Sequence, residues 1–414
     1  MKEKWYVLFW VIFVFCLVGR AFAMESPQRL EFQGRKGWKL ENDKVEIIAL
    51  EGGGHIVYAG LKSQGDSGVN PYWVPHWKSM EPAQFDAEKH APIFGKNNEA
   101  KLLASIMGHN ICLDFFGVPS EAEYEYGGIT VHGEAPVVPW KEVRTWGNEE
   151  ETGLIYEGKL PESQLVIRRT LVLRKNEPVL RIKEELTNKG SFDRPIGWCQ
   201  HVTFGAPFVE KGVTFFDFPS GRGAVAPFAF SNDMRYEKGK EYRWPYIPGS
   251  SGELINARFA AAEDKSSDYT ANLLDRNLNY GYFTAVNPRK DLMVGYVWDN
   301  KLFPWLDNWE ENHARTHKPW NGNEMTRGME FSTTPWTYTR KETVRQGAFF
   351  DTSTYEWIGA GKTITTEYFA FYISPPENFI GTEMLKLDRN SIEIEGKSGE
   401  KITVPCREIN NVFK

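Results

Sequence analysis

The chain has 414 residues, of which 41% are hydrophobic and 14% aromatic, enough for one large packed domain or two ordinary ones. Its 49 basic and 55 acidic residues give a net charge of -6 at pH 7, and the sequence has no Lys/Arg run. Phosphate backbones are bound by clustered positive charge, so this balance argues against a nucleic-acid partner.

Residues 1–23 are predicted to be a secretory signal. Lys2 and Lys4 precede an apolar run from Trp5 to Val18, and Ala21-Phe22-Ala23 forms an A-x-A cleavage site. The run is short for a membrane span, which needs about 20 apolar residues. We therefore expect export to the periplasm or beyond, with membrane contact only through this segment. A retained N-terminal anchor is the alternative.

Three cysteines remain after cleavage at this site, namely Cys112, Cys199 and Cys406. An odd number in an exported protein permits at most one intrachain disulfide, and their spacing does not match a zinc site. The sequence also lacks a phosphate-cradling glycine loop and a serine-nucleophile elbow. We therefore expect neither a metal nor another cofactor.

Strand patterns dominate the chain from its start. Lys44–Leu50 and His55–Leu61 flank a glycine turn and predict a first hairpin. Asn98–Ile106 is the one helical candidate, with Asn98 as its N-cap. A longer hairpin is predicted from Leu165–Leu173 and Val179–Leu186, because apolar residues alternate along both segments. Further strands are expected at Trp198–Phe204, Val213–Phe218, Tyr282–Val286, Leu292–Trp298 and Thr363–Ile373.

The pattern indicates one all-β sandwich domain over residues 31–375. After Pro376 the strand pattern weakens, and residues 376–414 are predicted to be a short C-terminal extension. Two small strands are expected in it, at Ser391–Glu395 and Lys401–Val404. The 15 Trp residues suit a large β core, and they also suit sugar binding, because the C–H faces of a pyranose stack on aromatic rings. The sequence leaves the oligomeric state open.

Glu330 is the most informative residue, because it is the only charged residue in a strand-like run that follows Arg327 and ends at Pro335. A lone buried carboxylate is costly unless it is paired or hydrogen-bonded, so Glu330 calls for an explanation. His132 and His201 lie upstream, each in a β context. Together the three indicate acid–base chemistry on a sugar. The alternatives are a satisfied core histidine for His201, an ordinary loop-edge histidine for His132, and a structural carboxylate for Glu330.

A second group of candidates is expected to bind the sugar. Residues 303–312 have the composition of a sugar-facing loop, in which Trp305 and Trp309 stack on a ring while Asp307, Glu310 or Asn312 binds hydroxyls. A packing loop with a solvated acidic rim is the alternative. Arg327 is also assigned to substrate binding. It lies three residues before Glu330, and an odd separation in an extended strand places two side chains on opposite faces.

The order of several motifs resembles the galactose mutarotase-like (aldose 1-epimerase) family. Phe115-Phe116-Gly117, His132-Gly133-Glu134-Ala135 and Trp140 are similar to its first histidine region. Glu185–Gly190 followed by His201–Gly205 is similar to its second, and Arg327–Glu330 to its catalytic glutamate segment. The resemblance implies a β-supersandwich, two large twisted antiparallel sheets with a sugar cleft. The chain is longer than typical members, is expected to be exported and has a Trp-rich insert at residues 70–77. It is therefore most similar to a poorly characterised branch.

The same resemblance implies roles for the three candidates in opening and closing a pyranose ring. Glu330 would be the base at the O1 hydroxyl, His201 the acid at the ring oxygen, and His132 would bind a hydroxyl and polarise the ring oxygen. The expected ligand is a sugar or oligosaccharide. The alternatives are a non-catalytic carbohydrate-binding protein on the same fold, or a periplasmic glucan-processing or lyase-like protein. The acidic, Trp-rich loops fit a neutral sugar better than the uronic acids that a lyase needs.

Overall fold

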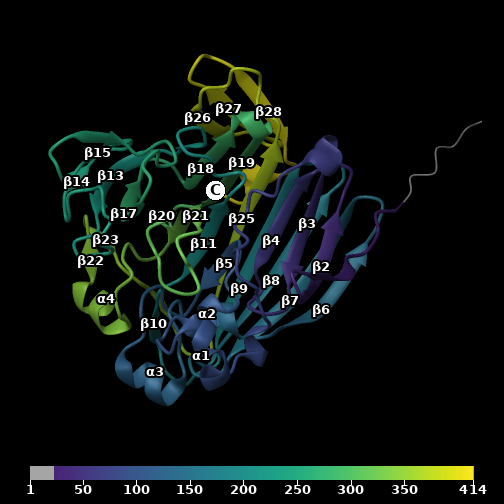
Figure 1. Ribbon diagram of the computed structural model, residues 1–414. Helices are drawn as coiled ribbons and strands as arrows, with labels where there is room; N and C mark the ends of the chain where they lie inside the picture. Colours follow the sequence, from purple (N-terminus) through teal and green to yellow (C-terminus); the bar gives the residue numbers. More distant parts are fainter. Residues whose placement is uncertain (1–22, 414) are drawn as a thin grey trace, which may run out of the picture.

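Two large antiparallel sheets, stacked face to face, form the body of the protein in the computed structural model, which describes residues 23–413 (Figure 1). The predicted all-β sandwich is therefore confirmed. The signal segment predicted over residues 1–23 lies outside the described residues, apart from Ala23. Within the described part, no helix combines the length and the apolar character that a membrane crossing requires.

The larger sheet has the strand order β1-β2-β3-β4-β5-β11-β21-β20-β17-β13-β14. Its strands are β1 (Gln28–Phe32), β2 (Arg35–Glu41), β3 (Val45–Leu50), β4 (Ile56–Leu61), β5 (His109–Cys112), β11 (Cys199–Gly205), β21 (Met325–Ser332), β20 (Trp305–Asn312), β17 (Ser266–Leu274), β13 (Ser220–Val225) and β14 (Glu241–Tyr242). The predicted first hairpin is β3–β4. The strands at its centre come from distant parts of the chain, which brings β11, β21 and β20 side by side.

The smaller sheet has the order β12-β18-β19-β25-β9-β8-β7-β6. Its strands are β12 (Phe215–Asp217), β18 (Tyr280–Asn287), β19 (Leu292–Asp299), β25 (Thr363–Ile373), β9 (Val179–Asn188), β8 (Leu165–Arg174), β7 (Glu151–Leu160) and β6 (Trp140–Gly147). The predicted long hairpin is β8–β9, in which Leu171 lies opposite Ile182. Leu165, Ile167, Leu171 and Leu173 are fully or almost fully buried on one face of β8, as the alternation predicts.

The main core lies between the two sheets. It joins apolar side chains of the larger sheet, such as Val202 and Phe331, to those of the smaller sheet, such as Ile167, Val294 and Tyr368. Full burial of one large aliphatic side chain is worth about 1.5–3 kcal/mol, so this interface stabilises the sandwich. Cys112, Cys199 and Cys406 are buried, and their thiols are free.

The α-helices are short and lie toward the bottom of the view, at one end of the sandwich (Figure 1). They are α1 (Ala87–Phe94), α2 (Ala100–Leu103), α3 (Glu121–Gly127) and α4 (Arg340–Gln346). The helix predicted at Asn98–Ile106 is therefore confirmed only at its centre, and Glu99 occupies the N-cap in place of Asn98. Two others begin at capping boxes, Ser120 with Glu123 and Thr339 with Glu342, which the sequence analysis missed.

A three-stranded sheet forms the C-terminal part, at the top of Figure 1. It consists of β26 (Thr382–Leu387), β27 (Ser391–Gly396) and β28 (Lys401–Pro405), which confirms the two strands predicted there. One apolar cluster joins this part to the smaller of the two main sheets. It contains Ile392, Ile394 and Val404 together with Phe369 and Phe371 of β25. The domain boundary at residue 376 stays a prediction.

Short pairings and single turns of 3-10 helix complete the described elements. The two-stranded sheets are β10 (Arg194–Ile196) with β24 (Glu356–Ile358), β15 (Tyr246–Pro248) with β16 (Leu254–Asn256), and β22 (Ala348–Phe349) with β23 (Thr352–Ser353). The 3-10 helices are η1 (Lys62–Ser67), η2 (Pro82–Gln84), η3 (Ala135–Val137), η4 (Pro288–Lys290) and η5 (Ile409–Asn411). Most of these lie in the long connections that cover the sheet edges.

Candidate functional site

A row of polar side chains crosses the centre of the larger sheet. His201 on β11 lies opposite Glu330 on β21, and Glu330 lies opposite Asp307 on β20. Residues that face each other in antiparallel strands point to the same side of a sheet, so the three share one face. The intervening core residues Val202, Met329 and Phe331 point to the other face. The row therefore lies on the face that is turned away from the core.

A cavity of about 330 Å³ opens over this row. Its lining includes His132, His201, Glu330, Trp309 and Tyr269. The three residues predicted to carry out acid–base chemistry, which span about two hundred positions of the sequence, therefore converge on one cavity. Trp309, predicted to stack on a sugar, lines the same space.

His132 reaches the cavity from a tight turn and not from a strand. Its φ is 69°, and that of Gly133 is 78°, so two successive residues adopt the left-handed conformation. A Cβ at Gly133 would lie 2.4 Å from the carbonyl oxygen of Leu113, so glycine is required there. The turn places the His132 ring 5.0 Å from that of His201, centroid to centroid. His132 Nδ1 lies 2.5 Å from the Phe116 carbonyl oxygen and donates to it.

His201 and Glu330 form the closest titratable pair at the cavity. The distance from His201 Nε2 to Glu330 Oε1 is 3.2 Å, and His201 Nδ1 lies 2.9 Å from the hydroxyl of Thr203. The pair lies within ion-pair range without forming an aligned hydrogen bond. Both carboxyl oxygens of Glu330 are buried and find no hydrogen-bond partner among residues 23–413. The carboxyl group is therefore free to bond a hydroxyl group of a ligand.

Burial sets the protonation of these groups. It raises the pKa of Glu330 well above its usual value, and the Asp307 carboxyl beside it adds to the shift. Burial likewise lowers the pKa of His201 well below its usual value, and His132 adds to this shift. For His132, burial alone would lower the pKa, but the Cys112 thiol and the Phe116 carbonyl raise it overall. Burial therefore favours the neutral forms of both groups, a protonated Glu330 beside an uncharged His201.

The prediction of a loop at residues 303–312 is wrong, because most of the segment forms strand β20. Trp305 is fully buried, donates through Nε1 to the Ser353 carbonyl oxygen at 3.1 Å, and stacks on Phe349. It packs and does not line the cavity. Asp307 shares the face of Glu330, but its Oδ2 accepts a 3.0 Å bond from the Ser332 hydroxyl, and it is not part of the lining either.

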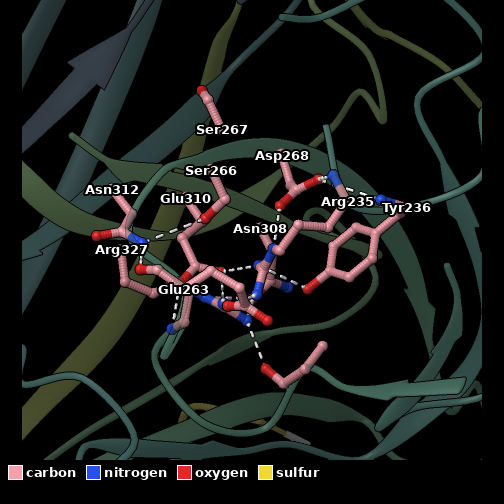
Figure 2. Close-up of polar contacts among 12 residues, drawn as sticks. Arg235, Tyr236, Glu263, Ser266, Ser267, Asp268, Asn308, Glu310, Asn312 and Arg327 are labelled. Atoms are coloured by element: carbon pink, nitrogen blue, oxygen red, sulfur yellow. Dashed lines mark hydrogen bonds and ion pairs between the residues drawn. The ribbon is translucent and has the colours of Figure 1, made fainter. Parts of the chain in front are cut away.

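Arg327 and Asn312, both expected to bind substrate, lie on the face of the sheet opposite to Glu330. Both belong to the network of polar contacts drawn in Figure 2. Arg327 donates to Glu310 Oε2 at 2.9 Å and to Asn308 Oδ1 at 2.9 Å. Asn312 donates to the Glu263 carbonyl oxygen at 2.7 Å. The alternation of side chains along β20 and β21 is the physical reason, since odd and even positions alternate between the two faces. Neither residue lines the cavity, so their assignment to substrate binding is corrected.

Several lining residues were missed in the sequence. Phe116 stacks on His132 with ring centroids 5.5 Å apart, and Tyr269 lies on β17. Arg315 places its guanidinium carbon 4.7 Å from the Trp320 ring and 5.5 Å from the Trp309 ring. Phe116 stood within a motif that the resemblance singled out. The others lie in stretches with no pattern, and only the fold brings them together. Among the described residues, no cluster of His, Cys, Asp and Glu is arranged to hold a metal ion.

Comparison with known proteins agrees with this fold. A family model described as Domain of unknown function (DUF4432) matches residues 86–349. A candidate aldose 1-epimerase from Klebsiella pneumoniae has a similar structure, with a TM-score of 0.61 and 16% identity, covering 82% of this chain and 80% of that one. A galactose mutarotase-like protein from Clostridium acetobutylicum has a TM-score of 0.57 and 12% identity, covering 85% and 99%. Among curated proteins, no sequence matches the chain.

These structural similarities extend over most of the chain. A galactose mutarotase-related enzyme from Lactobacillus acidophilus has a TM-score of 0.50 and 14% identity, over 82% of this chain and 97% of that one. At such low identity the likeness concerns the fold alone. The predicted galactose mutarotase-like supersandwich is thereby confirmed.

Proposed function

The chain belongs to the DUF4432 family, a family of domains of unknown function, and we propose that it is an aldose 1-epimerase-like isomerase that interconverts sugar anomers. The observation that carries this proposal is the convergence of His132, His201 and Glu330 on one cavity. A buried carboxyl without a hydrogen-bond partner is expensive, so its position beside a ligand-sized space favours a functional role.

Anomer exchange needs one proton to leave O1 and another to reach the ring oxygen. When the O1 proton moves to a base, the C1–O5 bond breaks, its electron pair stays on O5, and an acid protonates O5. Rotation about C1–C2 and the reverse steps close the ring on the other face. The reaction consumes no net proton, so it requires a pair that holds one proton between an acid and a base.

The His201–Glu330 pair meets this requirement. In the direction expected from the resemblance, Glu330 is the carboxylate that accepts the O1 proton, and His201 is the imidazolium that protonates O5. Burial favours the neutral forms, so a proton must first pass from Glu330 to His201 across the 3.2 Å between Oε1 and Nε2. The uncharged pair serves the same reaction with the roles exchanged. His132 donates through Nδ1 to Phe116, which leaves Nε2 for a sugar oxygen.

Carbohydrate binding without turnover is the second candidate. Trp309 and Trp320 line the cavity beside the three polar groups, and aromatic faces bind pyranose rings whether or not chemistry follows. In that case Glu330 would only bond hydroxyls. Measured anomer exchange separates the two.

The test is the catalysis of anomer exchange by the wild type, Glu330→Gln and His201→Ala, followed by polarimetry or exchange NMR on a panel of aldoses. Loss of a general acid or base typically costs a factor of about 10²–10⁴, so we expect each variant to lose at least a hundredfold in kcat. Glu185→Gln, on the outer face of the smaller sheet, is the matched control and should keep full activity. If both cavity variants stay fully active on a sugar that the wild type turns over, the assignment is wrong.

A further inference from the structure

Away from its three reacting groups, the cavity is lined mainly by apolar side chains. Leu102, Leu103 and Ile106 come from α2 and the residues after it, and Phe228 and Phe230 come from the loop after β13. The three aliphatic side chains are 3–5% exposed and belong to the same apolar cluster as Trp309 and Trp320. A ligand in the cavity therefore meets a wall of hydrocarbon side chains as well as the acid–base pair.

Few polar partners remain for the other hydroxyl groups of a sugar. Besides the three reacting residues and the Tyr269 hydroxyl, the polar lining consists of two indole N–H groups and three half-buried side chains. The indole groups belong to Trp309 and Trp320 and have no partner among the described residues, and the side chains are those of Glu99, Arg315 and Thr337. Arg315 is already engaged, since its Nε lies 3.3 Å from Glu311 Oε2 and its guanidinium covers Trp320. A hydroxyl group that is buried without a partner costs about 1–3 kcal/mol. A fully hydroxylated hexose would lose this free energy of binding at each hydroxyl group that contacts the apolar lining.

The apolar wall begins directly beside the reacting groups. The Phe116 ring lies 6.3 Å from His201 and 6.3 Å from Tyr269, and Tyr269 stacks on Phe230 at 5.4 Å. Ligand pockets usually range over about 300–1,000 Å³, so a cavity of about 330 Å³ is at the size of a single sugar residue. The wall therefore contacts the reacting sugar itself and not a distant aglycone.

We propose that the substrate is a deoxy sugar, of the 6-deoxyhexose class, whose methyl-bearing edge lies against Leu102, Leu103 and Ile106. The inference rests on the proposed function for the placement of C1 at His201 and Glu330. With C1 there, the other edges of the sugar contact the remaining lining, which is mainly apolar. Replacing a hydroxyl by hydrogen at that edge removes a polar group that the cavity does not bond, and the methyl group gains contact with the aliphatic side chains.

Matched pairs of sugars provide the first test. We expect the kcat/KM for anomer exchange to be at least tenfold higher for 6-deoxy-D-galactose than for D-galactose, or for 6-deoxy-D-glucose than for D-glucose. Within each pair only one hydroxyl group differs, so the ratio measures its cost at the wall. Equal values, or a preference for the hydroxylated sugar in both pairs, would overturn the inference.

Variants of the wall provide the second test. Leu103→Asn supplies an amide to the wall. Ile106→Thr supplies a hydroxyl, keeps the β-branch and removes only the terminal methyl group, so it guards against loss of folding in the first variant. Each is expected to reduce the preference for the deoxy sugar to threefold or less. Lys101→Gln, on the same helix but outside the cavity lining, should preserve the preference. An unchanged preference in both folded wall variants would contradict the proposal.

Calorimetric binding to the Glu330→Gln variant separates this inference from the proposed function. Tighter binding of the deoxy sugar by tenfold or more, together with no turnover by the wild type, would keep the inference and remove the isomerase. Turnover without any preference would keep the isomerase and remove the inference. If neither sugar of a pair binds or reacts, both proposals fail.

Discussion

Glu330 combines full burial with an unsatisfied carboxyl group, and it is central to the proposed function. It is 1% exposed, it lies opposite Asp307 across the sheet, and neither of its oxygens has a hydrogen-bond partner among the described residues. Burial of an unsatisfied carboxyl group opposes folding, so a fold that retains one gives up stability at that position. Buried, unsatisfied titratable groups are common at functional sites, where a ligand supplies the missing hydrogen bonds.

Replacing this carboxyl is expected to stabilise the protein, and more so at higher pH. In the unfolded chain Glu330 ionises near its usual pKa of 4.5, whereas in the folded protein burial raises its pKa well above that value. The stability of the wild type therefore falls as the pH rises from about 4.5 toward the folded pKa. Glu330→Gln removes this loss, so its free energy of unfolding should exceed that of the wild type by about 1–3 kcal/mol at pH 8.

Denaturant unfolding of the wild type and of Glu330→Gln at pH 4 and pH 8 checks the sign of this difference in the free energy of unfolding. We expect the advantage of Glu330→Gln to shrink at pH 4, where the wild-type carboxyl is protonated in both states. The Glu185→Gln variant should show no comparable dependence on pH. An advantage that is the same at both pH values, or a variant that is less stable at pH 8, would mean that Glu330 is not held as an unsatisfied acid.

The strand β20 shows which secondary structure cannot be predicted from the alternation of apolar residues. Alternation of apolar residues predicted β8 and β9 well, because alternate side chains along each strand pack in the main core. In β20 both faces are polar, since Asp307 and Glu311 lie on one side and Asn308, Glu310 and Asn312 on the other. The strand therefore had the composition of a loop. The arginines that satisfy its inner face come from elsewhere in the chain, and no local pattern could supply them.

The network on the inner face is expected to contribute to stability and not to catalysis. Glu310 is buried and accepts bonds from Arg235 at 2.6 Å and Arg327 at 2.9 Å, and these arginines lower its pKa despite burial. Glu310→Gln would leave the buried guanidinium group of Arg327 without a carboxylate partner, whereas Arg235 would keep Asp268 at 2.7 Å. We expect a loss of about 3–5 kcal/mol in the free energy of unfolding, measured by denaturant titration.

The exposed pair of Arg222 and Glu241, 2.8 Å apart, offers the matched control. Glu241→Gln should change the free energy of unfolding by less than about 1 kcal/mol, because solvent screens exposed pairs. The KM of the Glu310→Gln protein that remains folded should equal that of the wild type. A small stability loss combined with a raised KM would place this network in the binding site instead.

At the scale of the whole molecule, the site depends on contacts between segments that are far apart in sequence. The resemblance predicted the supersandwich, which is confirmed, and it pointed to His132, His201 and Glu330, which line one cavity. It could not supply the strand order of the larger sheet, in which β5, β11, β21 and β20 are neighbours. Nor could it supply the left-handed turn at His132, which depends on contacts with Leu113 and Phe116. The covering of the cavity by α2 was equally out of reach, because it joins segments more than one hundred residues apart.

A polar network also ties the two sheets together behind the site. Gln200 on β11 donates to Glu184 on β9 at 2.6 Å, and Arg169 on β8 donates to the same carboxylate at 2.6 Å. All three side chains are fully buried, and Gln200 directly precedes His201. The strand that carries His201 is therefore fixed on its inner face by the smaller sheet, while its outer face is open to the cavity.

A crystal structure of the Glu330→Gln variant with a sugar bound would test the central claim most directly. We expect one sugar in the cavity, with O1 or the ring oxygen within about 3.2 Å of His201 Nε2. Its anomeric carbon should face the substituted side chain. A sugar bound at another surface, or one whose anomeric carbon points to the cavity mouth away from His201, would contradict it.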